Sequence, residues 1–274
     1  MPESRSASAQ TPFVWGVRTY VMGIINATPD SFSGDGLAGR PADAMACALR
    51  MAQEGADVID IGGQSTRPGH VEVGTDEEIR RVNEVLAELA GRLDVPISID
   101  TYRFEVAEAA IAAGAVIIND VWGLRREPRL AQLAAATGSM LIVMHNRAEA
   151  IYQDLMAEVI ADLRWSVATA LDAGVSSEHL IIDPGIGFGK TPAHNLEILR
   201  RLSELRVLEL PILLGTSRKS VIGKVLDLPA DERIEGTAAT VALGIANGVD
   251  MVRVHDVKEM VRVVRMSDAI VRGG

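Results

Sequence analysis

The chain has 274 residues, enough for one large domain or two small ones. Hydrophobic residues make up 48% and charged residues 23%, so a packed core can form, and the net charge of −10 argues against binding nucleic acid or anionic membranes. The single cysteine, Cys47, excludes disulfides and cysteine-rich zinc sites and suits a reducing, cytoplasmic location. No apolar stretch is long enough to span a membrane, and residues 1–11 lack the apolar segment of a signal peptide.

Short apolar runs alternate with helical patterns along the chain. Eight runs read as strands, at residues 20–26, 56–61, 96–99, 116–118, 140–144, 180–182, 211–214 and 251–254. Helical patterns cover residues 41–54, 75–90, 104–113, 128–136, 148–173, 195–205, 234–246 and 257–270, with a short one at 220–226. Several of them end at a glycine, and residues 75–78 read as a capping box.

The strand pattern predicts the fold class. The runs are continuous in Val, Ile and Leu, as in parallel strands covered on both faces. Eight strand–helix units in a chain of this length predict an α/β protein with a (β/α)₈ TIM barrel. The alternative, an open doubly wound sheet, usually carries Gly-x-Gly-x-x-Gly after its first strand, whereas this first run ends in Asn-Ala-Thr-Pro-Asp. No linker divides the chain, so we predict a disordered tail over residues 1–12 and a single domain over residues 13–274.

Residues 183–190, Asp-Pro-Gly-Ile-Gly-Phe-Gly-Lys, form the most informative stretch. Asp183 stands where an apolar strand ends, and the three glycines that follow allow positive φ and a close approach of backbone to a ligand. Phe188 offers a flat apolar face and Lys190 a cation. An ordinary strand-to-helix turn with Asp183 as its cap would look similar, but polar residues also end the other strands.

In a (β/α)₈ barrel the carboxyl ends of the strands carry the active site. Eleven side chains are expected at that end: Asn26, Thr66, Arg67, Asp100, Asn119, Met144, His145, Asp183, Lys219, Arg253 and His255. Buried polar groups are costly unless partnered, so such a ring predicts a ligand site. Thr101, Asp120 and Asp256 fit equally well as loop starters or helix caps.

One part of this ring suits a flat, nitrogen-rich heterocycle. Asp100, Asn119 and Asp183 supply acceptors and an amide, and a carboxylate can accept two N–H bonds from a ring edge. The side chains of Phe188 and Met144 and the stem of Lys219 would cover the faces of the heterocycle: aromatic, thioether and ammonium groups all interact favourably with π-systems.

The other part suits a phosphate or diphosphate. Its members are Asn26, Arg67, Arg253 and His255, with Asn26 placed to coordinate a divalent cation. Ser217 precedes the helical pattern at 220–226, whose N-terminus could hold a carboxylate or phosphate. Neither Gly-x-Ser-x-Gly nor His-Glu-x-x-His occurs, while Schiff-base chemistry at Lys190 or Lys219 stays open.

Most of these residues stand in segments that resemble the dihydropteroate synthases, folate-pathway enzymes that are targets of sulfonamides. Met22-Gly-Ile-Ile-Asn-Ala-Thr-Pro-Asp-Ser-Phe-Ser opens the resemblance, and Asp-Ile-Gly-Gly-Gln-Ser-Thr-Arg-Pro-Gly follows at 60–69. The full set of matching segments is 22–33, 55–69, 97–101, 118–121, 183–191, 214–220, 235–240 and 252–257. Together they extend over the predicted barrel from residue 21 to about residue 257.

The resemblance implies a transferase that joins 7,8-dihydropterin-6-ylmethyl diphosphate to 4-aminobenzoate, giving 7,8-dihydropteroate and diphosphate, with Mg²⁺ and as a homodimer. The residues it implies for the pterin are Asp100, Asn119, Met144, Asp183, Phe188, Gly215 and Lys219. Those for the diphosphate are Asn26, Arg253 and His255, with Asn26 also on Mg²⁺. Those for 4-aminobenzoate are Phe32, Thr66, Arg67, Pro68 and Ser217. The implied catalytic set is Asp100, Asp183, Lys219, Arg253 and His255.

The chain departs from the family pattern in two places. The first loop reads Ser33-Gly34-Asp35-Gly36 where the family usually has Ser-Asp-Gly-Gly, and Gln64 stands where Glu is common. The loops at 27–40 and 62–74 are rich in Gly, Ser and Pro and are predicted to close over the diphosphate.

Two rival functions fit the same fold. One is a methyltransferase that passes a methyl group from methyltetrahydrofolate to a corrinoid protein. The other is a non-catalytic paralogue that binds pterin without turnover, which the altered first loop keeps open.

Overall fold

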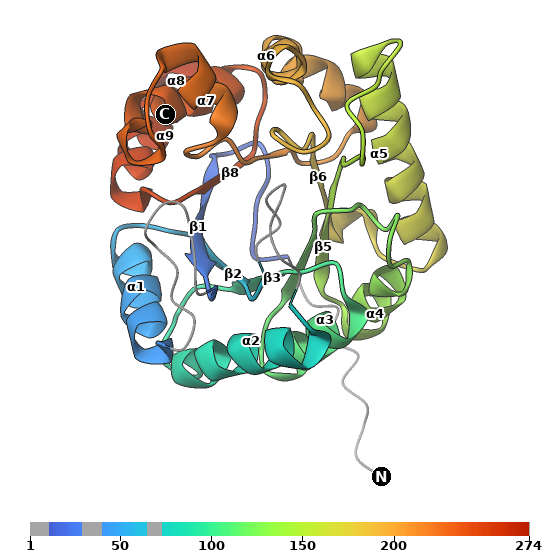
Figure 1. Cartoon of the computed structure of the whole chain (residues 1–274), viewed down its shortest axis with the longest axis vertical. Coiled ribbons are helices and arrows are strands. Elements are labelled where there is room, and N and C mark those ends of the chain that lie inside the picture. The colour runs from blue at the N-terminus through green and yellow to red at the C-terminus, as the bar shows by residue number, and fades with distance from the viewer. Residues whose placement is uncertain (1–10, 29–39, 65–72, 274) are drawn as a thin grey trace.

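The computed structural model describes residues 11–28, 40–64 and 73–273, and within them it contains a ring of eight parallel strands (Figure 1). The strands are β1 (Tyr20–Asn26), β2 (Val58–Gly62), β3 (Ile97–Asp100), β4 (Ile117–Asp120), β5 (Met140–Met144), β6 (Leu180–Asp183), β7 (Leu213–Leu214) and β8 (Met251–Val254). Their order is β6-β5-β4-β3-β2-β1-β8-β7, and a parallel bridge between Ile182 and Ile212 joins β6 to the β7 segment. The predicted (β/α)₈ TIM barrel is therefore confirmed.

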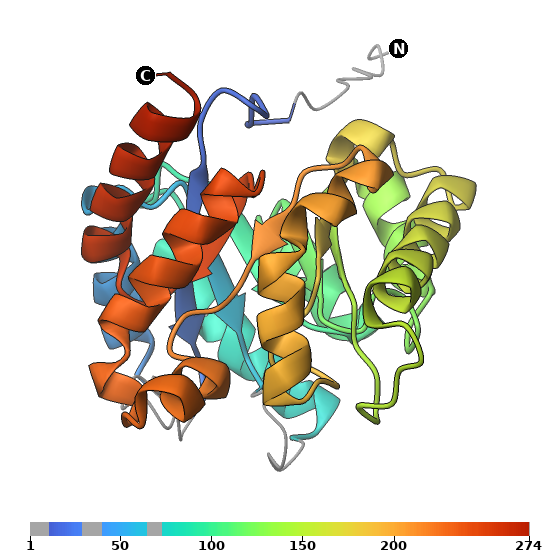
Figure 2. The same cartoon turned by 90° about the horizontal axis from the view of Figure 1, so that it is seen from above.

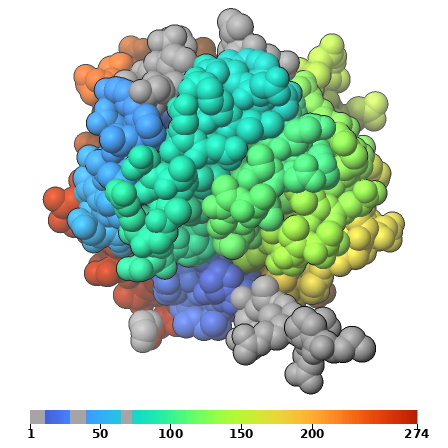
Figure 3. Space-filling model, turned by 90° about the horizontal axis from the view of Figure 1, so that it is seen from below, coloured from blue at the N-terminus to red at the C-terminus, as the bar shows by residue number. Residues whose placement is uncertain are grey.

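Helices surround the strands on all sides (Figures 1 and 2). The helices are α1 (Pro41–Gln53), α2 (Thr75–Leu89), α3 (Phe104–Ala112), α4 (Arg129–Thr137), α5 (Leu155–Asp172), α6 (Pro192–Arg200), α7 (Ser220–Leu226), α8 (Ile234–Ala246) and α9 (Val257–Val271). Figure 3 shows α2 and α3 side by side over one flank of the barrel. None of the described helices is long and apolar enough to cross a membrane.

The start of α5 differs from the sequence prediction. The helix begins at Leu155, although the pattern predicted helix from residue 148. Asp154 caps it by accepting a hydrogen bond from Ala157 N, and the Glu158 carboxylate accepts bonds from the backbone N–H groups of Gln153 and Asp154. Asp154 thus satisfies a free N–H group of the first turn, and Glu158 fixes the two residues that precede the helix. Together these bonds place the helix start at Leu155.

The helix predicted over residues 195–205 also has different bounds in the structure. It starts earlier, at Pro192, because Thr191 and His194 form a capping box there. After Arg200 the chain continues as a 3₁₀ helix, Leu202–Leu208. A proline at the first helical position is compatible with the helix, since its missing N–H has no partner there in any case.

The capping box predicted at residues 75–78 is wrong. Gly74 is the N-cap of α2, and no side chain caps that end. Glu78 is instead buried and binds two side chains of the β3–α3 loop. Its Oε1 accepts from Thr101 Oγ1 at 2.9 Å, and its Oε2 pairs with Arg103 Nη1 at 2.8 Å. A buried carboxylate is stable only when paired, and this pairing takes the side chain away from the helix end.

The lower half of the barrel interior, at the amino ends of the strands, is apolar. Its core consists of Phe13, Tyr20, Met22, Val58, Ile117, Met140, Ile142, Ile181, Leu213 and Met251. Phe13 and Tyr20 pack edge to face near the amino ends of the strands, with Trp15 beside them. A side chain two positions further along a strand faces the same side. The residues that follow this core at that spacing therefore point into the upper half of the barrel.

Candidate active site

Above the apolar core, the interior positions become polar at one level. Two residues after Val58, Ile117, Ile181 and Met251 stand Asp60, Asn119, Asp183 and Arg253, and Gly215 follows Leu213 in the same way. Asp100 lies beside Asn119 in the register of β3 and β4, and Met144 beside Asp183 in that of β5 and β6. The alternation of the strands thus brings the residues predicted for the heterocycle to the carboxyl end of the barrel.

Arg253 is the centre of a buried charge network. Its Nε donates to Asp60 Oδ2 at 2.6 Å, and its Nη2 donates to Asp100 Oδ2 at 2.8 Å. Asn119 Nδ2 donates to the same Asp60 oxygen at 3.2 Å. Side chains from four strands are thereby fixed relative to one another.

Asp60 was missed by the sequence analysis. It lies inside β2 rather than at its end, and its side chain is fully buried. The available signal was an acid in the otherwise apolar run Val58-Ile-Asp-Ile61, two residues after an interior valine. A charge there has to be paired, which predicts a cation inside the barrel.

Two carboxylate oxygens of this network have no partner among the described residues. Asp60 Oδ1 and Asp100 Oδ1 are both buried and unpaired there. Burial raises the pKa of Asp100, the Asp60 charge raises it further, and the Arg253 charge opposes both. A buried acceptor without a donor is costly, so these oxygens favour a ligand that brings N–H groups.

Asp183, Gly215 and Lys219 meet on the other side of the ring. Asp183 Oδ1 accepts from Gly185 N at 2.6 Å, which leaves Oδ2 facing the interior. A Cβ on Gly215 would lie 3.7 Å from Lys219 Nζ and 4.0 Å from Asp183 Oδ2. Burial raises the pKa of Asp183, and the Lys219 charge opposes this shift.

Lys219 also contacts the glycine-rich loop. Its Nζ donates to the carbonyl of Ile186 and lies 4.7 Å from the centroid of the Phe188 ring. This cation–π contact joins Lys219 to Phe188, whereas the contact predicted from the sequence, between Lys219 and the heterocycle, stays a prediction. Met144, at the end of β5, is buried beside Asp183.

His255 and Ser217 are in direct contact, although the resemblance assigns them to different subsites. Ser217 Oγ lies 2.9 Å from His255 Nδ1 and accepts from His255 N at 3.1 Å. Their neighbours Arg218 and Asp256 form an ion pair, with Arg218 Nε donating to Asp256 Oδ2 at 3.0 Å. Asp256 stands at the N-cap position of α9, but its side chain makes no cap hydrogen bond there and pairs with Arg218 instead.

The remaining predicted residues lie at or beyond the edge of the described structure. Asn26 ends β1 beside Gly62. Within residues 11–28, 40–64 and 73–273, no three His, Cys, Asp or Glu side chains gather closely enough to hold a metal ion. The predictions for Phe32, Thr66, Arg67 and Pro68, and the shifted Asp35, fall on residues outside these ranges.

Gln64 holds the two ends of the second loop together. Its Oε1 accepts from Val73 N at 3.2 Å, and its Nε2 lies 3.0 Å from Tyr102 Oη. A glutamate at this position would keep the first bond, but Tyr102 would have to donate the second. The presence of Gln64 in place of the family's usual glutamate therefore changes the hydrogen bonding where this loop begins and ends.

His145 and Lys190 turn away from the ring. His145 is buried, its Nε2 lies 3.2 Å from Asp162 Oδ2, and its Nδ1 lies 2.7 Å from Lys190 Nζ. Lys190 Nζ also donates to two loop carbonyls. The Schiff-base alternative at Lys190 loses its support, because this amine is occupied within the loop.

We expect His145 to make the protein sensitive to acid. Burial lowers the pKa of its ring from 6.5 to about 4, so its contribution to stability is present above pH 6.5 and is lost as the pH falls towards 4. Over this range, the free energy of unfolding should fall by about 2 kcal/mol more in the wild type than in His145→Gln. Denaturant titrations at several pH values measure the difference, and parallel curves for the two proteins would contradict the assignment.

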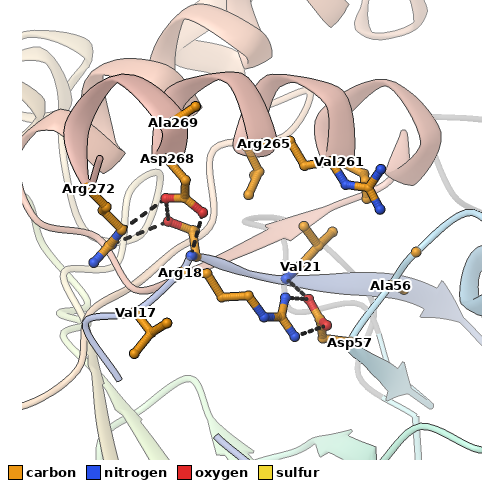
Figure 4. A pocket seen from close by; sticks show the side chains of 13 residues that line it. Val17, Arg18, Val21, Ala56, Asp57, Val261, Arg265, Asp268, Ala269 and Arg272 are labelled. Carbon is orange, nitrogen blue, oxygen red and sulfur yellow. Dashed lines mark hydrogen bonds and ion pairs between the residues drawn. The ribbon is translucent and has the colours of Figure 1, made fainter. Parts of the chain in front are cut away.

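A surface pocket of about 570 Å³ lies at the opposite, amino-terminal end of the barrel (Figure 4). Four of its five charged side chains, all except Arg265, are paired with one another. Arg18 forms two hydrogen bonds with Asp57, and Asp268 accepts from Thr19 N and from Arg272 Nε. These paired charges make the pocket a weaker candidate than the ring at the carboxyl end, where buried acceptors remain open.

Comparison with known proteins agrees with this geometry. The sequence profile of the family described as "Pterin binding enzyme" matches residues 22–255. The dihydropteroate synthase of Bacillus subtilis is 49% identical over 257 residues, which cover 94% of this chain and 90% of that protein.

Two solved structures are also similar. The dihydropteroate synthase of Clostridium difficile, solved in the presence of pteroic acid, superposes with a TM-score of 0.91 at 50% identity, covering 95% of this chain and 99% of the other. The Yersinia pestis dihydropteroate synthase, solved as a sulfonamide drug complex, gives a TM-score of 0.89 at 40% identity, covering 94% and 95%. Over nearly its whole length, therefore, the chain belongs to the pterin-binding enzyme family and, within it, to the dihydropteroate synthases.

Proposed function

We propose that this chain catalyses the dihydropteroate synthase step of folate biosynthesis. It joins 7,8-dihydropterin-6-ylmethyl diphosphate to 4-aminobenzoate and releases diphosphate. The observation that carries this proposal is the buried ring in which Asp100 keeps an open acceptor opposite Asp183, with Arg253 and Lys219 between the two acids. The relatives at 40–50% identity, including the one solved with pteroic acid, support the same reaction.

The pterin is held by the inner ring. Asp183 and Asp100 accept N–H groups from the edges of the heterocycle, and the amide of Asn119 binds beside them. Phe188 and Met144 line its faces, while Gly215 leaves room for it next to Lys219. The two carboxylates also stabilise positive charge that spreads over the pterin during the reaction.

The diphosphate is held by Arg253 and His255, with Asn26 nearby. These residues fit a Mg²⁺ ion bound mainly through the substrate, since Mg²⁺ keeps several waters and commonly binds through one or two protein oxygens plus phosphates. The Asn26 amide oxygen would be its protein ligand. When bound, the ion offsets the charge that grows on the departing diphosphate.

4-Aminobenzoate is bound by Ser217 together with Phe32, Thr66, Arg67 and Pro68, the residues that the family resemblance assigns to it. An arylamine is neutral and nucleophilic at pH 7, so the chain needs no strong base. Departure of the diphosphate is the demanding step, and we expect a dissociative, SN1-like displacement. Single-turnover rates with substituted 4-aminobenzoates should then be nearly independent of the basicity of the amine, and a steep dependence would exclude this mechanism.

The test of the function is formation of dihydropteroate from the two substrates, with Mg²⁺ present or removed by a chelator. Product formed only with both substrates and Mg²⁺ supports the proposal. Pterin binding without product would identify a non-catalytic paralogue. Methyl transfer from methyltetrahydrofolate to a corrinoid protein would identify the rival methyltransferase.

The protein is also proposed to work in the cytoplasm as a homodimer that uses α8 and α9. Leu243 on α8 and Met266 and Ile270 on α9 are 63–71% exposed, although large apolar side chains are usually buried. Met266 and Ile270 are four residues apart and so share one helix face. Sedimentation of the 29.3 kDa chain at twice its mass would agree, and a monomer at micromolar concentration would not.

A further inference from the structure

The loop between β6 and α6 is pressed against the loop that follows β5. Gly185 and Gly189 both have positive φ. A Cβ on Gly185 would collide with the carbonyl oxygen of His145, and one on Gly189 would collide with that of Arg147. These two glycines therefore let the backbones touch, and the position of Phe188 between them depends on how this contact is held.

Lys190 holds the contact from the outer side. Its Nζ donates to the carbonyls of Gly185 and Phe188, both at 2.9 Å. These two residues already form a turn, in which Phe188 N donates to Gly185 O at 3.1 Å. One ammonium group thus ties together both ends of the turn that carries the Phe188 ring.

The third donor of Lys190 is met by His145 at 2.7 Å. On the other side of this ring, Nε2 lies 3.2 Å from the Asp162 carboxylate of α5, which can only accept. The proton of the neutral ring therefore belongs on Nε2, and Nδ1 accepts from the ammonium. The adjacent His145 ring, the largest cause, lowers the pKa of Asp162 to about 2.

A second lysine binds the same loop from the side of the active site. Lys219 donates to Ile186 O and lies over the Phe188 ring, so the turn is held between two ammonium groups. The chain has only four lysines, and two of them make these contacts. A compact ammonium can direct three N–H groups to three nearby acceptors, which a planar guanidinium cannot do in the same space.

We infer that Lys190 is a positioning residue for the pterin subsite: with His145 and Asp162 behind it, it fixes the carbonyls of Gly185 and Phe188, so that the Phe188 ring and Asp183 meet the heterocycle. The inference rests on the proposed function. Lys190 Nζ is bonded to His145 and to the carbonyls of Gly185 and Phe188. Among the described residues, no hydrogen bond joins it to Ser217, which belongs to the proposed 4-aminobenzoate subsite. Loss of the Lys190 ammonium should therefore raise KM for the pterin diphosphate and leave KM for 4-aminobenzoate nearly unchanged.

The test compares Lys190→Met with Lys258→Met, a matched change at an exposed lysine of α9. Burial lowers the pKa of Lys190 to about 7, the Asp183 charge raises it, and Lys219 and Arg147 lower it, so the assays are run near pH 6, where the ammonium form predominates. We expect Lys190→Met to raise KM for the pterin diphosphate about tenfold, since charge-assisted hydrogen bonds are lost. KM for 4-aminobenzoate should stay within about twofold, and Lys258→Met should match the wild type.

A chemical rescue separates positioning from general stability. Lys190→Cys in a Cys47→Ser background has one cysteine, and its alkylation with 2-bromoethylamine restores an amine of nearly the same length. The pterin KM should return towards the wild-type value. Lys190→Gln keeps an amide donor and should give an intermediate pterin KM. If Lys190→Met does not fold, Lys190→Gln and the alkylated Lys190→Cys replace it in the comparison.

Three results would overturn the inference. They are an unchanged pterin KM in a folded Lys190 variant, an equal rise in both KM values, and a failure of the added amine to restore the pterin KM. A wild type that binds pterin but forms no dihydropteroate would instead refute the proposed function, and the pterin Kd of each variant would still test the role of Lys190.

Discussion

Asp183→Asn is expected to lower kcat/KM for the pterin diphosphate about a thousandfold while the protein stays folded. Asp183 Oδ1 already accepts from Gly185 N, and the asparagine oxygen can keep that bond. The variant loses the second, charged acceptor, Oδ2, which faces the heterocycle. The asparagine amide places an N–H donor at that point. A heterocycle edge that presents N–H groups then meets an N–H group, and the positive charge developing on the pterin loses a neighbouring anion.

Asp120→Asn is the matched control for this prediction. Asp120 also ends a strand and is buried, but it accepts from Trp122 N and Leu124 N on the outer side of β4. Its replacement should lower the free energy of unfolding by about 1 kcal/mol and leave the pterin KM unchanged. If both variants lose activity equally, or if Asp183→Asn retains wild-type kcat/KM, Asp183 does not bind the pterin.

The second large effect is expected on stability, from Asp60→Asn. Asp60 is fully buried, binds Arg253 and receives the Asn119 amide on the same oxygen. Removal of its charge leaves the Arg253 guanidinium with Asp100 alone, and breaking one partner of a buried pair costs about 3 kcal/mol. Because Arg253 and Asn119 both lose their anchor, turnover should also fall.

Asp57→Asn tests whether burial is the cause of the stability loss expected for Asp60→Asn. Asp57 lies just before β2 at the other end of the same segment and pairs with Arg18, the two side chains being 18% and 51% exposed. It also accepts from Val21 N at 2.8 Å, a bond that the asparagine oxygen can keep. A pair that reaches the solvent contributes about 1 kcal/mol or less, so this variant should lose much less stability than Asp60→Asn. Urea titrations of both variants measure the difference, and equal losses would contradict the buried network.

The sequence predicted the barrel and most of its ring because both follow from local patterns. Continuous apolar runs identified the strands, and polar residues at their ends identified Asp100, Asn119, Asp183 and Arg253. Asp60 was missed because the site residues were predicted at the ends of strands, and Asp60 lies inside one. Only the alternation counted from Val58 shows that this acid faces the interior, next to Arg253.

Other differences depend on contacts between distant segments. Glu78 has the spacing of a capping box, but Arg103 and Thr101, which follow the next strand, draw it into a buried pair. Lys190 follows a glycine-rich loop and looked available to a ligand. Its direction is set by positive φ at three glycines and by His145, a residue 45 positions away. Patterns within one segment do not contain this information.

The most direct test of the central claim is the rate of diphosphate release by the wild-type protein with Mg²⁺ and the dihydropterin diphosphate, measured as 4-aminobenzoate is titrated. A saturable, 4-aminobenzoate-dependent release, matched by dihydropteroate formed in equal amount, is the result that the proposed site predicts. No release at any 4-aminobenzoate concentration, with the pterin still bound, would contradict it and leave a pterin-binding protein without synthase activity.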